Sequence, residues 1–386
     1  MNDVGLAAGA AIEGTVARGF EHVRDVFVQN FSRSDAYQEL GASLAVYHRG
    51  KLVADLWGGH TDANRKRAWQ RDTLINVYST TKGVAAMALA MLADEGKLDY
   101  SACVTKYWPE FGAAGKENIT VAQLLSHQAG LTGFLEPTSW TDLYDWSATC
   151  AKLARQAPLF PPGSAASYHA MTWGFLAGEL VRRISGMSIG RFIRERIAQP
   201  LRADFFIGLP DSHESRVATL YAPKLPPDLS QLTQPPQALA ALANPQLDPE
   251  IPNQHAWRAA EIPAANGQAS ALGLARIYAA LAGGGELDGV RLLSREGIDR
   301  MLVRQTGKTD LLLGFTDNWA MGMCFNQFNM LGPRADTFGH GGWGGSFGCA
   351  NLDAGIAIGY VDNQMGGQLV GDPRATALCD AIFACV

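Results

Sequence analysis

The sequence predicts an α/β protein in which both ends of the chain build one unit of strands and helices around a mostly helical insertion. Two observations favour this arrangement. Apolar runs of strand length, bounded by turn residues, occur at 42–57 and again at 319–361. Between 101 and 263, apolar residues at helical spacing alternate with loops rich in Pro and Gly. The predicted division is therefore an α/β domain of 1–100 with 264–386, and a helical domain of 101–263.

The N-terminal elements follow from apolar spacing. A helix is expected over 12–32, where Val16, Phe20 and Val23 recur at helical intervals. A β-hairpin is expected next, because two apolar runs flank the turn at 48–51. The strands of this hairpin are expected at 42–47 and 52–57.

The remaining elements are interrupted by one irregular segment. Residues 222–252 carry eight prolines, so a long surface loop without regular structure is expected there, bordering a binding site. A strand at 74–77 leads into an apolar helix that ends at Gly96. Further helices are expected at 119–127, 171–185, 188–197, 269–283, 294–303 and 373–385. Further strands are expected at 319–325, 336–340, 346–351 and 355–361.

Composition excludes several classes of function. Charged residues make up 18% of the chain and the net charge is −5, which indicates no bias toward nucleic acid or an anionic membrane surface. No apolar run approaches the roughly 20 residues of a membrane span. The six cysteines are scattered without a C-x-x-C pair, and Met1 to Gly5 lack a basic region. We therefore expect reduced thiols, no secretory signal and a cytoplasmic location; the oligomeric state is not indicated.

The first candidate site is Ser79 with Lys82, at the start of the apolar helix. Residues three apart on a helix share a face, so the amine can reach the hydroxyl if the helix begins at or just before Ser79. A lysine of lowered pKa can then serve as the base that activates the serine. The alternative is a capping serine followed by a solvated lysine. The helix is apolar all round, which predicts that it is buried and that both side chains open into a core or a cleft.

Two other clusters lie far along the chain. Tyr168 follows a Pro-Pro-Gly turn and stands just before a helix, where it could also be a simple packing residue. The segment 338–348 is rich in glycine, so its backbone either approaches a ligand closely or makes a turn between antiparallel strands. Trp343 in this segment is a core aromatic residue or one wall of a pocket.

The glycine-rich segment also holds Ser346 in a G-x-S-x-G pattern, the nucleophile elbow of α/β-hydrolases. In that fold the acid and the histidine follow the serine in the chain. Here the last histidine is His340, which precedes Ser346, and the flanks indicate strand–turn–strand. Ser346 is therefore not expected to be a nucleophile.

Taken together, the clusters resemble the serine hydrolases of the class C β-lactamase-like group, which share a fold with penicillin-binding DD-peptidases, and family VIII carboxylesterases most closely. The resemblance implies an antiparallel sheet flanked by helices, a mostly helical second domain, and an active site where the two meet. It runs over nearly the whole chain. The segments that carry it are 79–83, 107–111, 124–131, the turn before Tyr168, 178–180, 200–201 and 340–342.

The resemblance also implies roles for these residues. Ser79 attacks an acyl carbonyl and forms an acyl-enzyme, and Lys82 takes its proton with the help of Tyr168. Tyr168 then protonates the leaving alkoxide and helps to activate water; as a base it needs a neighbouring cation, which Lys82 is expected to be. The backbone N–H groups of Ser79 and Trp343 form the oxyanion hole. His340, Gly341, Gly342 and Trp343 bind substrate, and no metal or cofactor is implied.

Two departures from the family pattern concern the substrate. Where β-lactamases and DD-peptidases begin the third motif with Lys, this chain has His340, which is mostly neutral at pH 7. Where they often have Tyr-x-Asn, this chain has Tyr168-His169-Ala170. Both changes disfavour lactams and peptides and are compatible with neutral esters. His169 is either a partner of Tyr168 or a packing residue, and His127 is expected to be a structural hydrogen-bonding residue.

These observations predict a serine carboxylesterase that acts on short- to medium-chain acyl esters as small-molecule substrates. Three activities on the same fold are alternatives: β-lactamase, D-amino-acid amidase or peptidase, and transesterase. A protein that binds a β-lactam or cell-wall ligand without turnover is a second alternative.

Overall fold

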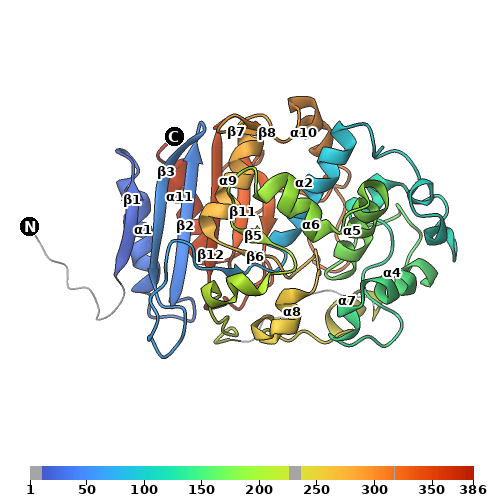
Figure 1. The fold of residues 1–386 in the computed structure, drawn as a ribbon, viewed down its shortest axis with the longest axis horizontal. Coiled ribbons are helices and arrows are strands. Elements are labelled where there is room, and N and C mark those ends of the chain that lie inside the picture. The colour runs from blue at the N-terminus through green and yellow to red at the C-terminus, as the bar shows by residue number, and fades with distance from the viewer. Residues whose placement is uncertain (1–10, 226–235, 317) are drawn as a thin grey trace, which may run out of the picture.

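A computed structural model describes residues 11–225, 236–316 and 318–386. Two sequence predictions concern residues outside these ranges, namely the expected lack of a secretory signal at Met1 to Gly5 and the irregular structure expected at 226–235. The described chain forms a large sheet covered by helices, with further helices extending away from one end of it (Figure 1). This arrangement agrees with the predicted fold class.

The large sheet is antiparallel and has seven strands in the order β1-β3-β2-β12-β11-β10-β9. Strands from the start and the end of the chain are neighbours, because β12 pairs along its whole length with β2. The expected hairpin is present as β2 and β3. The bounds are β1 Ile12–Val16, β2 Gly41–His48, β3 Lys51–Gly59, β9 Cys324–Phe325, β10 Phe338–Gly341, β11 Phe347–Asn351 and β12 Ile356–Asp362.

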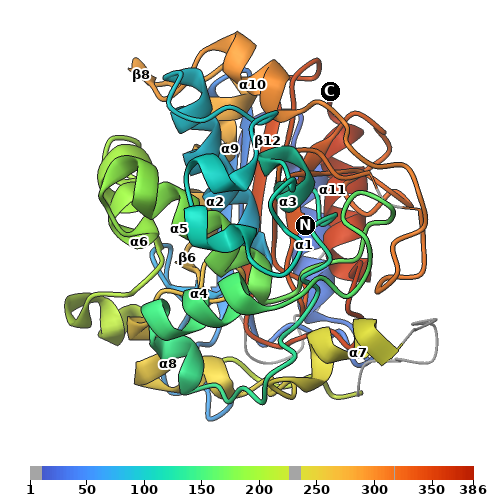
Figure 2. The same cartoon turned by 90° about the vertical axis from the view of Figure 1, so that its right-hand side faces the viewer.

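Side chains alternate between the two faces of the sheet, as the pleat of a strand requires. In β2, Leu44 and Val46 belong to one apolar core, whereas Ala45 and Tyr47 belong to the other. Helices α1 (Glu21–Phe31) and α11 (Pro373–Phe383) cover the first face, and α9 (Ala271–Ala282) and α2 (Thr80–Asp94) cover the second. Figure 2 shows this layering with the sheet between the two pairs of helices.

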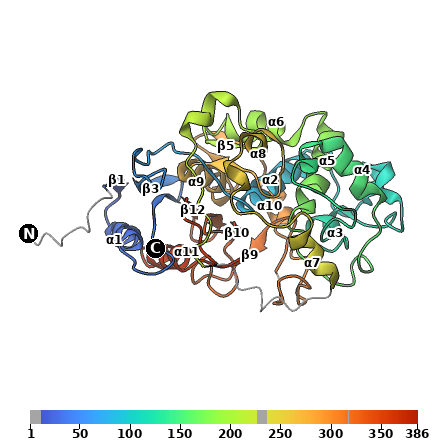
Figure 3. The ribbon, with the colours of Figure 1, turned by 90° about the horizontal axis from the view of Figure 1, so that it is seen from below.

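The middle of the chain is mainly helical. Residues 121–185 lie beyond α2, away from the sheet, whereas residues 194–198 pack against α9 (Figure 3). A small sheet, β4-β6-β5, forms at the junction, and β4 leads directly into α2. None of the helices among the described residues is long and apolar enough to cross a membrane. The remaining helices are α3 Val121–Leu125, α4 Trp146–Arg155, α5 Thr172–Ser185, α6 Ile189–Ile193, α7 Pro236–Ala243, α8 His255–Ala259 and α10 Arg295–Met301. The remaining strands are β4 Ile75–Asn76, β5 Phe205–Phe206, β6 Gln268–Ala269, β7 Glu286–Leu287 and β8 Val290–Arg291.

Short helical segments of other kinds complete the middle of the chain. A π-helical turn, Arg194–Ala198, continues α6, so the helix predicted over 188–197 is present with an irregular second half. The 3₁₀-helices are Val104–Lys106, Pro109–Gly112, Asp142–Tyr144, Asp211–Arg216 and Ile251–Asn253.

Two predicted elements are wrong, and a third is shorter than predicted. The helix expected over 12–32 is instead strand β1 followed by α1, because the first residues pair with the edge of β3. The segment 222–252 was expected to lack regular structure, but it contains α7, which begins at Pro236. Proline is tolerated in the first turn of a helix, where its missing N–H would have no partner in any case. The strand expected over 319–325 is confined to β9.

Candidate active site

Ser79 and Lys82 lie at the start of α2, with Ser79 in the N-cap position. The preceding residue, Tyr78, has a φ of +41°, so the chain turns sharply between β4 and the helix. Lys82 Nζ lies 3.1 Å from Ser79 Oγ, as the three-residue spacing predicts. The serine is partly accessible, and the lysine is fully buried.

The Lys82 amine contacts two backbone carbonyl groups besides the serine. Its Nζ donates to Ala170 O at 2.8 Å and to Ala264 O at 2.9 Å. No carboxylate forms a salt bridge with it among the residues that the structure describes. Burial without a counter-ion lowers the pKa of Lys82 well below its usual value, because desolvation disfavours the ammonium.

Tyr168 lies beside this pair. Lys82 Nζ is 4.8 Å from the centroid of the Tyr168 ring, and the ring stacks on Trp319 with centroids 5.5 Å apart and planes 13° apart. Burial raises the pKa of Tyr168, and a hydrogen bond with Ser79 opposes this shift. The role of Lys82 as a cation that eases ionisation of Tyr168 therefore stays a prediction. Desolvation favours the neutral form of both groups.

The backbone around Tyr168 is held by polar groups that the sequence analysis did not identify as functional. Asp310 Oδ1 accepts the Tyr168 N–H at 3.1 Å, and His127 Nδ1 accepts the His169 N–H at 3.0 Å. His169 Nε2 in turn accepts the Leu131 N–H at 3.1 Å. His127 is thus a structural hydrogen-bonding residue, as expected, and His169 has the same kind of role.

Asp310 and Trp319 were missed for a physical reason. Each is a single residue in a loop, about 140 positions or more from Tyr168, and no spacing pattern joins them to it. Only the folded chain brings the Asp310 carboxylate under the Tyr168 backbone and the Trp319 ring against its side chain.

The glycine-rich segment forms the turn between β10 and β11, across from Ser79. Trp343 packs on Tyr78 with ring centroids 5.3 Å apart. Among the described residues, neither the N–H of Trp343 nor that of Ser79 has a hydrogen-bond acceptor. Two backbone donors at the pocket are therefore available to a ligand.

His340 lies on β10 and lines the same pocket. Its Nδ1–H donates to Gly341 O at 2.8 Å. Burial lowers its pKa to about 3, and the nearby Lys82 acts in the same direction. The imidazole is thus neutral at physiological pH, as the sequence analysis expects.

Ser346, the serine of the G-x-S-x-G pattern, is buried and makes structural hydrogen bonds. Its Oγ donates to Val77 O at 3.0 Å, and its carbonyl oxygen accepts from Thr80 Oγ1 at 3.1 Å. These bonds join the β10–β11 turn to the start of α2. Strands flank the turn on both sides, as predicted.

The pocket over Ser79 is mostly apolar and aromatic. Its described lining includes Tyr78, Trp140, Leu242, Phe315 and Trp343. These residues come from both of the chain parts that the sequence separates into domains, although the domain division itself stays a prediction. The charged side chains among the described lining residues are the carboxylates of Asp248 and Asp372.

Comparison with known proteins agrees with this arrangement. The sequence model described as beta-lactamase matches residues 27–380. The chain is 36% identical to the esterase/beta-lactamase LipL of Mycobacterium tuberculosis over 86% of this chain and 78% of that protein.

Solved structures give the same result at higher identity. A family VIII carboxylesterase is 47% identical, with a TM-score of 0.91 over 97% of this chain and 100% of that one. A penicillin-binding protein homologue from Caulobacter crescentus is 45% identical, with a TM-score of 0.92 over 97% and 100% of the two chains.

The fold and these relatives define the class of the protein, which is that of the serine hydrolases with a β-lactamase-like fold. Within that class, the chain belongs to the beta-lactamase family.

Proposed function

We propose that this hydrolase is a carboxylesterase that cleaves short- to medium-chain acyl esters through an acyl-enzyme on Ser79. The observation that carries the proposal is the environment of Lys82. A neutral amine has two N–H groups and one lone pair. The carbonyl groups of Ala170 and Ala264 accept the two N–H groups, which leaves the lone pair for the Ser79 hydroxyl at 3.1 Å.

In the proposed acylation step, Ser79 Oγ attacks the ester carbonyl carbon while Lys82 Nζ takes the hydroxyl proton. The carbonyl oxygen becomes an oxyanion that accepts hydrogen bonds from the backbone N–H groups of Ser79 and Trp343. Such a donor typically contributes about 100- to 1,000-fold to the rate.

The intermediate then collapses. The bond between the acyl carbon and the alcohol oxygen breaks, and the leaving alkoxide takes the Tyr168 hydroxyl proton, which the Lys82 ammonium replaces. This assignment fits a tyrosine whose pKa is raised, because such a group serves better as a proton donor than as a phenolate. In deacylation, water attacks the acyl carbon and gives a proton to the same pair. The bond between the acyl carbon and Ser79 Oγ then breaks, and Ser79 Oγ takes that proton as the carboxylic acid leaves.

The charge of the pocket supports neutral esters as substrates. Penicillins and peptidoglycan stems carry a carboxylate. The described lining of the pocket holds no lysine or arginine, and it holds the carboxylate of Asp248 besides that of Asp372, which is paired with the buried Arg374. His340, at the position where the related lactamases have Lys, is neutral. We propose that His340, Gly341, Gly342 and Trp343 form the substrate wall beside the oxyanion hole.

Serine replacement tests the nucleophile. Ser79→Ala is expected to abolish hydrolysis of p-nitrophenyl butyrate, and Ser346→Ala is the matched control that keeps most of it. Mass spectrometry after mixing with an activated ester is expected to find a transient acyl adduct on Ser79. Activity that survives in Ser79→Ala and is lost in Ser346→Ala would overturn the proposal.

A substrate panel separates the esterase from its alternatives. Esters of increasing acyl length, nitrocefin and a D-amino-acid amide are compared by kcat/KM. The proposal expects the short- and medium-chain esters to be the best substrates. Faster turnover of nitrocefin or of the amide would favour the other acyl-transfer activities, and a permanent Ser79 adduct would indicate a binding protein.

The cytoplasmic location stays a prediction from the sequence.

A further inference from the structure

A buried cluster of charges lies directly behind the β10–β11 turn. It consists of Arg374, from the first turn of α11, and the carboxylates of Glu39, Asp362 and Asp372. The Arg374 side chain is completely buried, and so, almost completely, are the three carboxylates. The proposed reaction makes no use of this cluster. Burying an arginine costs desolvation free energy, which its ion pairs and hydrogen bonds must offset.

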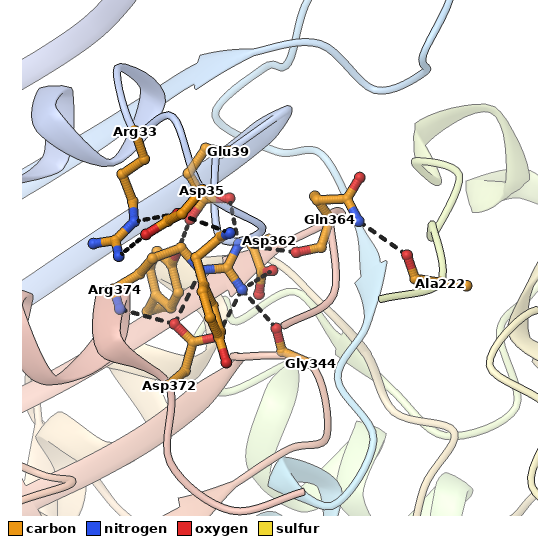
Figure 4. Close-up of polar contacts among 11 residues, drawn as sticks. Arg33, Asp35, Glu39, Ala222, Gly344, Asp362, Gln364, Asp372 and Arg374 are labelled. Atoms are coloured by element: carbon orange, nitrogen blue, oxygen red, sulfur yellow. Dashed lines mark hydrogen bonds and ion pairs between the residues drawn. The ribbon is translucent and has the colours of Figure 1, made fainter. Parts of the chain in front are cut away.

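The Arg374 guanidinium donates hydrogen bonds both to the carboxylates of the cluster and to the turn (Figure 4). Nε and Nη2 donate to the two carboxylate oxygens of Asp372, at 2.9 and 2.8 Å. Nη1 donates to Glu39 Oε2 at 3.0 Å and to Gln364 O at 2.9 Å. The contact that matters for the site is from Nη2 to Gly344 O, at 2.8 Å.

Gly344 directly follows Trp343, whose N–H is the proposed second oxyanion donor. Its carbonyl oxygen also accepts the Gly366 N–H at 2.7 Å, so two donors hold it. The next residue, Gly345, has a φ of +131°, and a Cβ there would lie 2.8 Å from Arg374 Nη2. The turn therefore rests directly on the guanidinium, with no side chain between them.

The other end of the turn is fastened to α2 through Ser346, whose Oγ and carbonyl oxygen bond to Val77 and Thr80. The Gly342 N–H donates to Ser346 O at 2.7 Å, so Trp343 lies between Gly342, which is attached through Ser346 to the start of α2, and Gly344, which is attached to Arg374. Since the two oxyanion donors come from Ser79 and Trp343, their separation depends on both attachments.

The cluster requires an arginine rather than any cation. A guanidinium is planar and presents five N–H donors in a fixed geometry, whereas an ammonium is a point charge with three. Burial raises the pKa of Glu39 to about 7, and burial also raises the pKa of Asp362 well above its usual value. The positive charge of Arg374 opposes both shifts, because it favours the ionised carboxylates.

We propose that Arg374 is a positioning residue that sets the place of the Trp343 N–H in the oxyanion hole by holding the Gly344 carbonyl. This inference rests on the proposed esterase function. It assigns to Arg374 no contact with substrate. Its effect is expected only on the step in which the carbonyl oxygen gains charge.

The test compares Arg374→Lys with wild type on an ester and on its thiono analogue, in which sulfur replaces the carbonyl oxygen. Sulfur is a weak hydrogen-bond acceptor, so the thiono ester gains little from the oxyanion hole. We expect kcat for the oxo ester to fall about 10-fold or more, with KM little changed, and kcat for the thiono ester to fall much less. A change in folded fraction alone would lower both rates in the same proportion.

Arg276→Lys is the matched control. Arg276 is also a largely buried arginine that bonds to a backbone carbonyl, Leu201 O, and pairs with Asp288, but it contacts nothing in the turn. We expect the ratio of oxo to thiono rates to stay at the wild-type value in Arg276→Lys and to fall in Arg374→Lys.

Hydrogen exchange gives a readout that needs no turnover. Amides of 341–346 are expected to exchange faster in Arg374→Lys than in wild type or in Arg276→Lys. Unchanged exchange, or equal loss of both ester rates, would overturn the role of Arg374 while leaving the esterase proposal intact. Wild-type protein that hydrolyses neither ester would overturn the proposed function, and the exchange data would still decide whether Arg374 holds the turn.

Discussion

Lys82 Nζ meets Ser79 Oγ at 3.1 Å, and the other two hydrogen-bond partners of that amine are main-chain carbonyl oxygens. Hydrogen bonds hold this lysine in place without a carboxylate that would stabilise its ammonium form. Its burial favours the form that can accept a proton, and its position places that form beside a hydroxyl group.

Replacing Lys82 by Met removes the proposed base. We expect Lys82→Met to lower kcat for ester hydrolysis by about 100- to 10,000-fold, because general-base assistance is lost. The matched control is Lys116→Met, since Lys116 is also buried and donates to the carbonyl groups of Ala113, Ala154 and Gln156. Stopped-flow acylation and thermal unfolding are measured on both. Lys116→Met is expected to lose stability and keep its kcat, and the opposite result would contradict the assignment.

The pH dependence of kcat/KM follows from the lowered pKa of Lys82. Protonated Lys82 cannot accept the serine proton, so activity is expected to fall as pH drops through the pKa of the folded enzyme and to level off above it. The plateau should begin below the ordinary lysine range near pH 10.4. The neighbouring His169 and His340, with pKa values of about 4 and 3, stay neutral over most of this range. A rate that decreases as pH rises from about 6 to 9 would contradict this reading.

The same group links stability to pH. The pKa of Lys82 is lower in the folded state than in the unfolded chain, so the unfolded chain binds more protons between the two values. The contribution of Lys82 to the free energy of unfolding is fully present above the pKa that Lys82 has in the unfolded chain. It is lost as pH falls through the pKa that Lys82 has in the folded protein. Denaturant titrations of wild type and Lys82→Met at several pH values should therefore show a smaller pH dependence for the variant.

Tyr168→Phe removes the proposed proton donor to the leaving group. Stacking of the ring on Trp319 can remain, so little stability should be lost. We expect kcat to fall by about 100-fold for alkyl esters and by less for p-nitrophenyl esters, whose leaving group needs little protonation. A plot of log kcat against the pKa of the leaving alcohol should become steeper in the variant. An equal loss for all leaving groups would assign Tyr168 a different role.

Asp310 is expected to act through the backbone of Tyr168. Asp310→Ala removes the oxygen that accepts the N–H groups of Tyr168 and Leu313, at 3.1 and 2.9 Å. Each buried donor left without an acceptor costs about 1–3 kcal/mol. Asp310→Asn keeps an oxygen there, so its free energy of unfolding and its kcat should lie between those of wild type and Asp310→Ala. Equal stability of all three proteins in urea titration would show that these bonds contribute little.

The sequence by itself determined the features that depend on neighbours along the chain. The contact of Ser79 with Lys82 follows from helix geometry, and the hairpin of β2 and β3 follows from apolar runs around a tight turn. The order of histidines and serines excluded Ser346 as the nucleophile of an α/β-hydrolase. These inferences need no knowledge of distant parts of the chain, because backbone periodicity fixes which side chains share a face.

Only the tertiary structure decided the features that arise from distant segments. Pairing with β3 turned Ile12–Val16 into a strand, although its apolar spacing continues that of the following helix. The loss of water around Lys82 and Tyr168 comes from many residues of both chain halves, and no local sequence pattern reveals it; it lowers the pKa of Lys82 and raises the pKa of Tyr168. The contacts of Asp310 with Tyr168 and of Arg374 with Gly344 join positions 142 and 30 residues apart. Hydrogen bonds and desolvation act through space, so their partners become visible only once the chain is folded.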